Sequence, residues 1–205
     1  MLFRSNEFRD FARLPTAKLT PIDINELVTD VLALYGHALE QGTLLVELGQ
    51  GLPEIQGDPT LLRQVVHNLV QNALDAVGEH PPAHEPARVL IRTDAPLKED
   101  GSIRAVRLVV RDNGPGFPDK ILKRAFEPYL TTKAKGTGLG LAVVKKIAEE
   151  HGALVRLRNL GDKGNQMAQA EPALGYPSHV HTVRGAQVSL SFSKLSSKTT
   201  QAGSH

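Results

Sequence analysis

The sequence predicts an α+β fold in which one mixed β-sheet carries helices on one face. Segments with apolar residues at helical spacing are interspersed with shorter segments of alternating polarity. Pairs of the shorter segments follow each other closely enough to form hairpins. Helices mixed with hairpin-like strand pairs are typical of this class, and no internal repeat is visible.

The composition is that of an ordinary globular chain. It has 205 residues, of which 40% are hydrophobic and 22% charged, enough for one domain with a sizeable core. The net charge of +2 gives no reason to expect nucleic acid as a partner. Because cysteine is absent, disulfides, thiolate metal sites and a cysteine nucleophile are excluded, and a reducing cytosolic environment fits. No apolar run reaches the roughly 20 residues of a membrane helix, and residues 1–7 lack the pattern of a signal peptide.

The N-terminal residues carry a narrow apolar stripe. Phe8, Phe11 and Leu14 recur at helical spacing before Pro15. The stripe predicts either a frayed helix docked on its own domain or the stump of a longer helix that pairs with another. Residues 16–21 are interpreted as a linker.

Two longer helices are expected next. Asp23 stands at the N-cap position of an apolar-faced helix that ends at Gly42. Asp58, followed by proline at the first helical position, begins a second helix that runs to about Val77. Between them, residues 44–48 are expected to form a strand.

The C-terminal half is expected to contain more strands than helices. Strands are expected at residues 88–93, 103–111, 154–158 and 186–192, a short helix at 119–125 and a longer helix at 142–151. The long, polar and pattern-free segment 161–184 indicates a functional or disordered loop. Residues 194–205 are rich in Ser, Thr and Lys and are expected to be a disordered tail.

A glycine-rich stretch stands directly before the last helix. Gly136, Gly138 and Gly140 occupy every second position, which suits neither a strand nor a helix interior. A glycine loop that leads into a helix N-terminus offers N–H groups to an anion, phosphate above all. The alternative interpretation is a tight turn.

The helix that begins at Asp58 has an unusual polar edge. Asn68, Asn72 and Asp75 fall within about 60° of one another around its axis. Such residues commonly form a solvated face, but Glu, Lys and Arg serve a solvated helix face with less loss of propensity. Asn carbonyls are hard oxygen ligands, so the other interpretation is a Mg²⁺ site shared with substrate phosphates.

Asp112 ends an expected strand and is followed by Asn113 and a glycine–proline–glycine turn. Ordinary turn chemistry explains this pattern. The functional interpretation is a carboxylate at the mouth of a pocket, where it can accept hydrogen bonds from an exocyclic amine such as that of adenine.

Four segments together resemble the N, G1, F and G2 boxes of sensor histidine kinases, in the order and with the separations of that family. The segments are residues 68–73, 112–116, 126–133 and 136–141. The resemblance covers about residues 16–193. Residues 6–15 are also similar to the end of the second dimerisation helix in nitrogen-regulation sensor kinases of the NtrY kind.

This resemblance implies a Bergerat-type two-layer α/β sandwich that binds ATP and Mg²⁺, as in gyrase-type, MutL and heat-shock chaperone ATPases. It implies a remnant of the dimerisation helix at residues 1–15, an ATP-binding catalytic domain at 16–193 and a tail at 194–205. Within the domain, an ATP lid is expected at about 117–136. The loop at about 161–184 replaces a short turn of the family and is expected to be an insertion.

The resemblance also implies roles for single residues. Asp112 would bind the adenine amino group, and Asn72 would hold Mg²⁺ with Asn68 near the metal or the phosphates. Lys133 in the lid would contact a phosphate, and it shares the implied catalytic role with Asn68. The other residues implied in nucleotide binding are Asp75, Gly114, Gly116, Phe117, Thr131, Thr132, Gly136, Thr137, Gly138, Leu139 and Gly140.

Asn68 separates two chemistries of these relatives. The hydrolysing members place a glutamate at this position, and an amide cannot serve as a general base for water. We therefore expect little hydrolysis and transfer of the γ-phosphate to a histidine in two-component signal transduction. None of the 8 histidines has the acceptor context of the family, so the chain alone is not expected to autophosphorylate.

The implied partners are the histidine-bearing dimerisation domain of a parent kinase and a response regulator, with no nucleic acid. The isolated chain is expected to be a cytoplasmic monomer, and the parent protein to be anchored in the inner membrane. One alternative is a catalytically silent nucleotide-binding interaction module, and another is a water-hydrolysing relative, which Asn68 disfavours. A dinucleotide-binding module is excluded because the glycines follow no strand and the acidic ribose ligand is absent.

Overall fold

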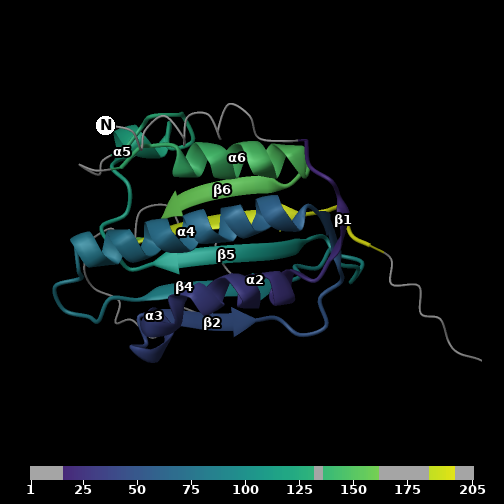
Figure 1. The fold of residues 1–205 in the computed structure, drawn as a ribbon, viewed down its shortest axis with the longest axis horizontal. Coiled ribbons are helices and arrows are strands. Elements are labelled where there is room, and N and C mark those ends of the chain that lie inside the picture. Colours follow the sequence, from purple (N-terminus) through teal and green to yellow (C-terminus); the bar gives the residue numbers. More distant parts are fainter. Residues whose placement is uncertain (1–15, 132–135, 162–184, 197–205) are drawn as a thin grey trace, which may run out of the picture.

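The computed structural model describes residues 16–131, 136–161 and 185–196 (Figure 1). The strands in these ranges are β1 (Thr20–Ile22), β2 (Leu44–Leu48), β3 (Ile55–Gly57), β4 (Val89–Asp94), β5 (Val106–Asp112), β6 (Leu154–Asn159) and β7 (Ala186–Phe192). The helices are α2 (Ile24–Leu32), α3 (Gly36–Glu40), α4 (Pro59–Glu79), α5 (Asp119–Leu122) and α6 (Gly140–Glu150), with a 3₁₀ turn η1 (Ala33–Tyr35). The predicted α+β class is confirmed.

The larger sheet has the strand order β2-β4-β5-β7-β6, and β1 pairs with β3 in a separate two-stranded sheet. Strand β2 runs parallel to β4, and the other neighbours in the larger sheet are antiparallel. This is the mixed sheet that the sequence predicts.

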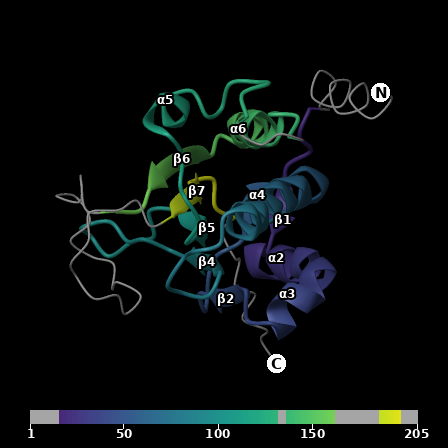
Figure 2. The ribbon, with the colours of Figure 1, turned by 90° about the vertical axis from the view of Figure 1, so that its left-hand side faces the viewer.

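Helices α2, α4 and α6 lie side by side on one face of the larger sheet, with α4 in the middle (Figures 1 and 2). Their apolar faces and the inner face of the sheet form one core. Val65 of α4, Val144 of α6 and Leu190 of β7 all lie in this core, and each of them is fully buried. The two-layer arrangement leaves the ends of α4, α6 and β5 free to form a site.

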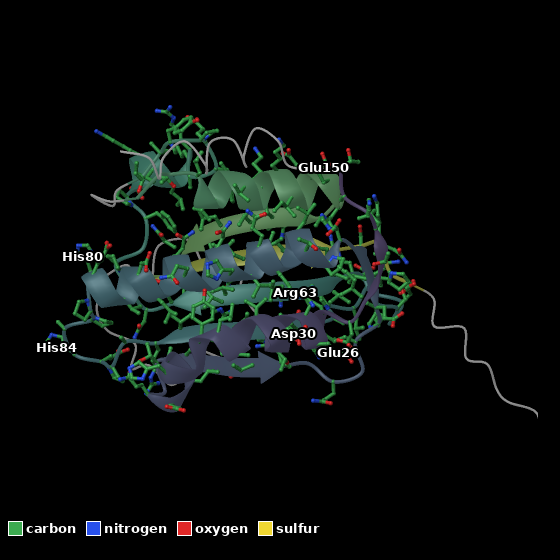
Figure 3. All side chains as sticks on the ribbon, viewed as in Figure 1. Glu26, Asp30, Arg63, His80, His84 and Glu150 are labelled. Atoms are coloured by element: carbon green, nitrogen blue, oxygen red, sulfur yellow. The ribbon has the colours of Figure 1, made fainter. Side chains whose placement is uncertain are left out.

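The outer surface of the helix layer carries a cross-helix ion pair. Arg63 of α4 and Asp30 of α2 point toward each other on this surface (Figure 3), with Nη2 and Oδ2 2.9 Å apart. Both side chains are about half exposed, so the pair contributes at most about 1 kcal/mol to stability.

Helices α4 and α6 are antiparallel and are joined at the end remote from the site. Nε2 of the buried His151, which directly follows α6, accepts a hydrogen bond from the Asp58 N–H at 2.9 Å. Nδ1 of the same ring lies 2.7 Å from the Ile147 carbonyl oxygen, to which it donates. One imidazole ring therefore links the start of α4 to the end of α6.

The structure corrects the linker predicted at residues 16–21. Residues Thr20 to Ile22 form β1 and pair antiparallel with β3, with Thr20 opposite Gly57. The sequence missed both strands because each has only three residues and no local period.

The single helix expected from Asp23 to Gly42 is interrupted. Asp23 does cap α2, since its carboxylate accepts hydrogen bonds from the Asn25 and Glu26 N–H groups. The chain then passes through η1 into α3 before it reaches Gly42, which has a φ of +69°.

The expected tail does not begin at Lys194. The Lys194 carbonyl accepts from the Gln56 N–H at 2.9 Å, and the Ser196 N–H donates to the Glu54 carbonyl at 2.8 Å. These residues extend the pairing at β3, so the prediction is wrong for 194–196. The remnant helix at 1–15, the insertion from 162 to 184 and the tail from 197 lie outside the described residues.

Within the described ranges, none of the helices combines the length and apolarity needed to cross a membrane.

Candidate functional site

The polar edge of α4 faces a cavity. The Asp58 carboxylate begins the helix by accepting hydrogen bonds from the Thr60 and Leu61 N–H groups at 3.0 and 3.2 Å. This cap fixes the helix register, so that Asn68 and Asn72 lie half-buried along the cavity wall. Their amides are brought together as the sequence predicts.

Asp75 also lines the cavity, one turn beyond Asn72. Its Oδ1 accepts a hydrogen bond from Gln71 Nε2 at 2.7 Å. The carboxylate is therefore oriented by a neighbour on its own helix.

The opposite wall begins at the end of β5. Oδ1 of Asp112 accepts hydrogen bonds from the Gly114 N–H at 2.9 Å and from the Ala186 N–H at 3.4 Å. These contacts hold the carboxylate at the cavity, which Gly116 and Phe117 also line. Gly114 lies behind this wall, where an added Cβ would come within 3.2 Å of the Ala76 carbonyl carbon. Its role is therefore close packing of the turn against α4.

The glycine loop lines the same cavity and leads into α6. Helix α6 has Leu139 at its N-cap and no side-chain hydrogen bond at that cap. Its N–H groups and the positive end of its dipole therefore remain available to an anion. A Cβ on Gly140 would stand 3.2 Å from Asn72 Nδ2, so the loop lies directly against the amide of α4.

Tyr129, within the lid expected at about 117–136, is bonded to the same loop. The Tyr129 N–H donates to the Gly138 carbonyl at 3.0 Å, and both residues have positive φ, 66° and 70°. A Cβ on Gly138 would lie 2.6 Å from the Tyr129 carbonyl carbon. Only glycine at position 138 permits this approach.

The cavity between these walls has a volume of about 1010 Å³. Apolar side chains of Leu69, Val110 and Val188 line it between the polar groups. The predicted residues that it brings together are Asn68, Asn72, Asp75, Asp112, Gly116, Phe117, Thr131, Gly136, Thr137, Gly138, Leu139 and Gly140. The predicted residues Thr132 and Lys133 lie outside the described part of the chain.

Sequence reasoning missed several lining residues. Gln64, Glu79 and His80 of the α4 segment also face the cavity, and Figure 3 places His80 at the C-terminal end of that helix. Helical spacing from Asn68 and Asn72 could have indicated Gln64 and Glu79. His80 follows the last helical residue, where helical spacing no longer predicts the direction in which a side chain points.

A residue on β6 was also missed. The Asn159 amide bonds to both backbone groups of Phe117, with the N–H donating to Oδ1 at 2.8 Å and Nδ2 donating to the carbonyl at 2.7 Å. No local pattern indicates this contact, because 42 positions separate the two residues.

The site fits a nucleotide with a divalent cation. Its volume is at the upper end of the roughly 300–1,000 Å³ common for ligand pockets. The Asp112 carboxylate suits a base amine, and the N-terminus of α6 suits phosphates. Among the described residues no three His, Cys, Asp or Glu side chains cluster as a metal site. The amides of Asn68 and Asn72 instead offer the few oxygen ligands that Mg²⁺ takes together with phosphates and water.

Comparison with known proteins gives the same assignment. Residues 57–194 match the family described as "Histidine kinase-, DNA gyrase B-, and HSP90-like ATPase". Sensor histidine kinase ZraS of Escherichia coli O157:H7 is 38% identical over 148 residues, which are 71% of this chain and 30% of that protein. The putative sensor histidine kinase NtrY-like of Rickettsia typhi is 32% identical over 159 residues, 78% of this chain and 25% of that protein.

A solved structure of similar size supports the same fold. The catalytic domain of histidine kinase ThkA superposes with a TM-score of 0.62 at 25% identity, covering 86% of this chain and 96% of that one. The present chain thus spans less than a third of the length of both curated relatives. The resemblance to sensor histidine kinases is confirmed, and the matched residues include every wall of the cavity. The chain belongs to the family of histidine kinase-, DNA gyrase B- and HSP90-like ATPases.

Proposed function

We propose that this chain binds Mg-ATP in the cavity and donates the γ-phosphate to a histidine of a sensor-kinase dimerisation domain, with a response regulator as the next acceptor. One observation carries the proposal: a carboxylate and a helix N-terminus without a side-chain cap line the same cavity. These two groups fit a ligand that carries both a base amine and phosphates.

Asp112 would accept from the adenine amino group, because the Gly114 N–H already fixes its Oδ1 in place. The amide oxygens of Asn72 and Asn68 would hold Mg²⁺, which neutralises phosphate charge when bound. The N–H groups that follow Leu139 would orient the phosphates. Lys133 would add a positive charge from the lid.

The transfer itself would need little from this chain beyond positioning and charge neutralisation. A nitrogen of the acceptor imidazole attacks the γ-phosphorus, the N–P bond forms, and the bond to the β-phosphate oxygen breaks to leave ADP. Asn68 supports transfer over hydrolysis, because an amide does not take a proton from water near neutral pH. We further propose that this domain lies in the cytoplasm, that it is a monomer when isolated, and that it belongs to a parent kinase anchored in the inner membrane.

Calorimetric titration with a non-hydrolysable ATP analogue, with and without Mg²⁺, tests the binding step. We expect binding that strengthens with Mg²⁺ and is lost in Asp112→Asn. Asp30→Asn is the matched control, because this carboxylate lies on the outer helix surface. Failure of the wild-type chain to bind, or unchanged binding by Asp112→Asn, would contradict the proposed site.

Mixing the chain with ATP and a separate histidine-bearing dimerisation domain tests the transfer step. Acid-labile phosphate on that domain is the expected result. Nucleotide binding without any transfer would favour the silent interaction module, and steady phosphate release from ATP alone would favour a hydrolase.

A further inference from the structure

The amide side chain of Asn159 holds one wall of the cavity from outside. It accepts from the Phe117 N–H at 2.8 Å and donates to the Phe117 carbonyl at 2.7 Å, as a neighbouring strand would. Asn159 is the last residue of β6 and is not itself among the residues that line the cavity. Any effect that it has on a ligand must therefore pass through Phe117.

The wall that Asn159 holds is a loop that leaves the sheet. It runs from Asn113 to Pro118, between the end of β5 and the start of α5. Pro115 has no N–H group, and Gly116 has a φ of +71°, so this stretch cannot continue the sheet ladder. Asn159 supplies the ladder-like pairing at its far end.

The near end of the same wall is held by Asp112 and Asn113. Asp112 Oδ1 accepts from the Gly114 N–H at 2.9 Å, and Asn113 Oδ1 accepts from the Arg88 N–H at 2.7 Å. The loop is thus fixed at both ends, by side chains that come from different strands.

Both anchors stand in one row of the sheet. Asn159 is opposite Ala186 on β7, and Ala186 is opposite Asp112 on β5. The row fixes the separation between the amide that holds Phe117 and the carboxylate that faces the cavity. Loss of the amide would let the Phe117 backbone move relative to Asp112.

We propose that Asn159 is a positioning residue for the nucleotide, and that it sets the width of the cavity at the Asp112 end through the Phe117 backbone. The inference rests on the proposed nucleotide binding. It assigns Asn159 no contact with the ligand and no part in the transfer of phosphate.

The test measures affinity and stability separately in Asn159→Ala, Asn159→Asp and a matched variant, Leu157→Ala. Leu157 lies two residues earlier on β6 and packs against the core, so its truncation destabilises the strand without touching Phe117. The probes are ADP and a non-hydrolysable ATP analogue, each with Mg²⁺, titrated by calorimetry. Urea unfolding of each variant gives the stability.

We expect Asn159→Ala to lower the affinity for both nucleotides by the same factor, about three- to tenfold, because two hydrogen bonds to the wall are lost. Equal factors are expected because the two probes share the base and differ in their phosphates. Asn159→Asp keeps the acceptor for the Phe117 N–H but sets a carboxylate oxygen against the Phe117 carbonyl oxygen, so it should bind both nucleotides no more tightly than Asn159→Ala. Leu157→Ala should lose stability with little change in affinity.

If the wild-type chain binds the nucleotides and Asn159→Ala binds them equally well, the role of Asn159 is refuted and the proposed function is unaffected. A loss of affinity in Leu157→Ala as large as that in Asn159→Ala would also overturn it, because the effect would then be general destabilisation. If the wild-type chain binds neither nucleotide, both the proposed function and this inference are refuted.

Discussion

Replacement of Gly185 by alanine should damage both stability and nucleotide binding. Gly185 directly precedes β7 and has a φ of +128°, a conformation nearly restricted to glycine. An added Cβ would stand 1.8 Å from the Asp112 carbonyl oxygen, 2.8 Å from its carbonyl carbon and 3.0 Å from Asn113 Cα. All three atoms belong to backbone, so no flexible side chain can move away.

The cost has two separable parts. The strained φ costs about 1–3 kcal/mol for a residue with a Cβ. Forcing a methyl group into closely packed atoms costs about 1–3 kcal/mol more. The expected loss is therefore about 2–6 kcal/mol, a large part of the roughly 5–15 kcal/mol that stabilises a typical domain.

Gly101→Ala is the matched control, because Gly101 has a φ of +78° with nothing within 4 Å of an added Cβ. Its loss should be only the roughly 1–2 kcal/mol of the unfavourable φ. Both changes alter the unfolded chain in the same way, so the difference between the variants reports the clash together with the extra strain of the φ at Gly185.

Urea unfolding and titration with a non-hydrolysable ATP analogue measure the two effects. Gly185→Ala should show the larger loss of stability and also weaker binding, since relief of the clash displaces the Asp112 backbone. Equal unfolding free energies for the two alanine variants, with unchanged affinity, would refute the reasoning and show that the strand ends relax at little cost.

Three further predictions concern Asp58, Gly138 and Tyr35. The pKa of Asp58 is below its usual value because hydrogen bonds from three backbone amides outweigh the opposing effect of burial. Its stabilising contribution is present above the unfolded pKa and is lost as pH falls through the folded pKa, so urea unfolding should show stability falling as the pH drops below the usual range of an aspartate pKa. Asp58→Asn, which keeps a good N-cap, should flatten this fall at little cost near neutral pH, and an unchanged slope would contradict the assignment. Gly138→Ala should lower the affinity for an ATP analogue and destabilise the fold by about 2–5 kcal/mol. The reason is that its Cβ would lie 2.6 Å from the Tyr129 carbonyl carbon at a φ of +70°. Wild-type affinity in the titration and wild-type stability in urea would contradict this. Burial and then the Asp75 charge raise the pKa of Tyr35 above 10.0. Comparison of the absorbance titrations of wild type and Tyr35→Phe should show the raised pKa of Tyr35. Asp75→Asn should lower this pKa. An unchanged pKa in Asp75→Asn would exclude the Asp75 charge as a cause.

The elements that the sequence predicted are those with a local period. Helix α4 and strands β2, β6 and β7 were found within about two residues, because their apolar positions repeat over several turns or pleats. Strands β1 and β3 were missed, since each is short and pairs with the other across more than 30 positions. The break of the first helix at η1 was missed because residues 33–39 keep an apolar pattern through it.

The residues of the site also divide into those that a local pattern predicts and those that it does not. Asn68, Asn72, Asp112 and the glycine loop could be found because each belongs to a contiguous motif whose residue types already indicate a chemistry. Their placement around one cavity agrees with the interpretation of the sequence. Asn159 and Gly185 belong to no motif, and each acts on a backbone segment more than 40 positions away.

Those distant contacts explain how short motifs can form one site. Helices α4 and α6 approach closely at two places: Gly140 lies against Asn72 at the cavity, and His151 holds the Asp58 N–H at the far end. The buried ring fixes the axial register of one helix against the other, so it also sets which amide of α4 meets the glycine loop. The motifs therefore supply the groups that can touch a nucleotide, while single residues outside them determine the distances between those groups.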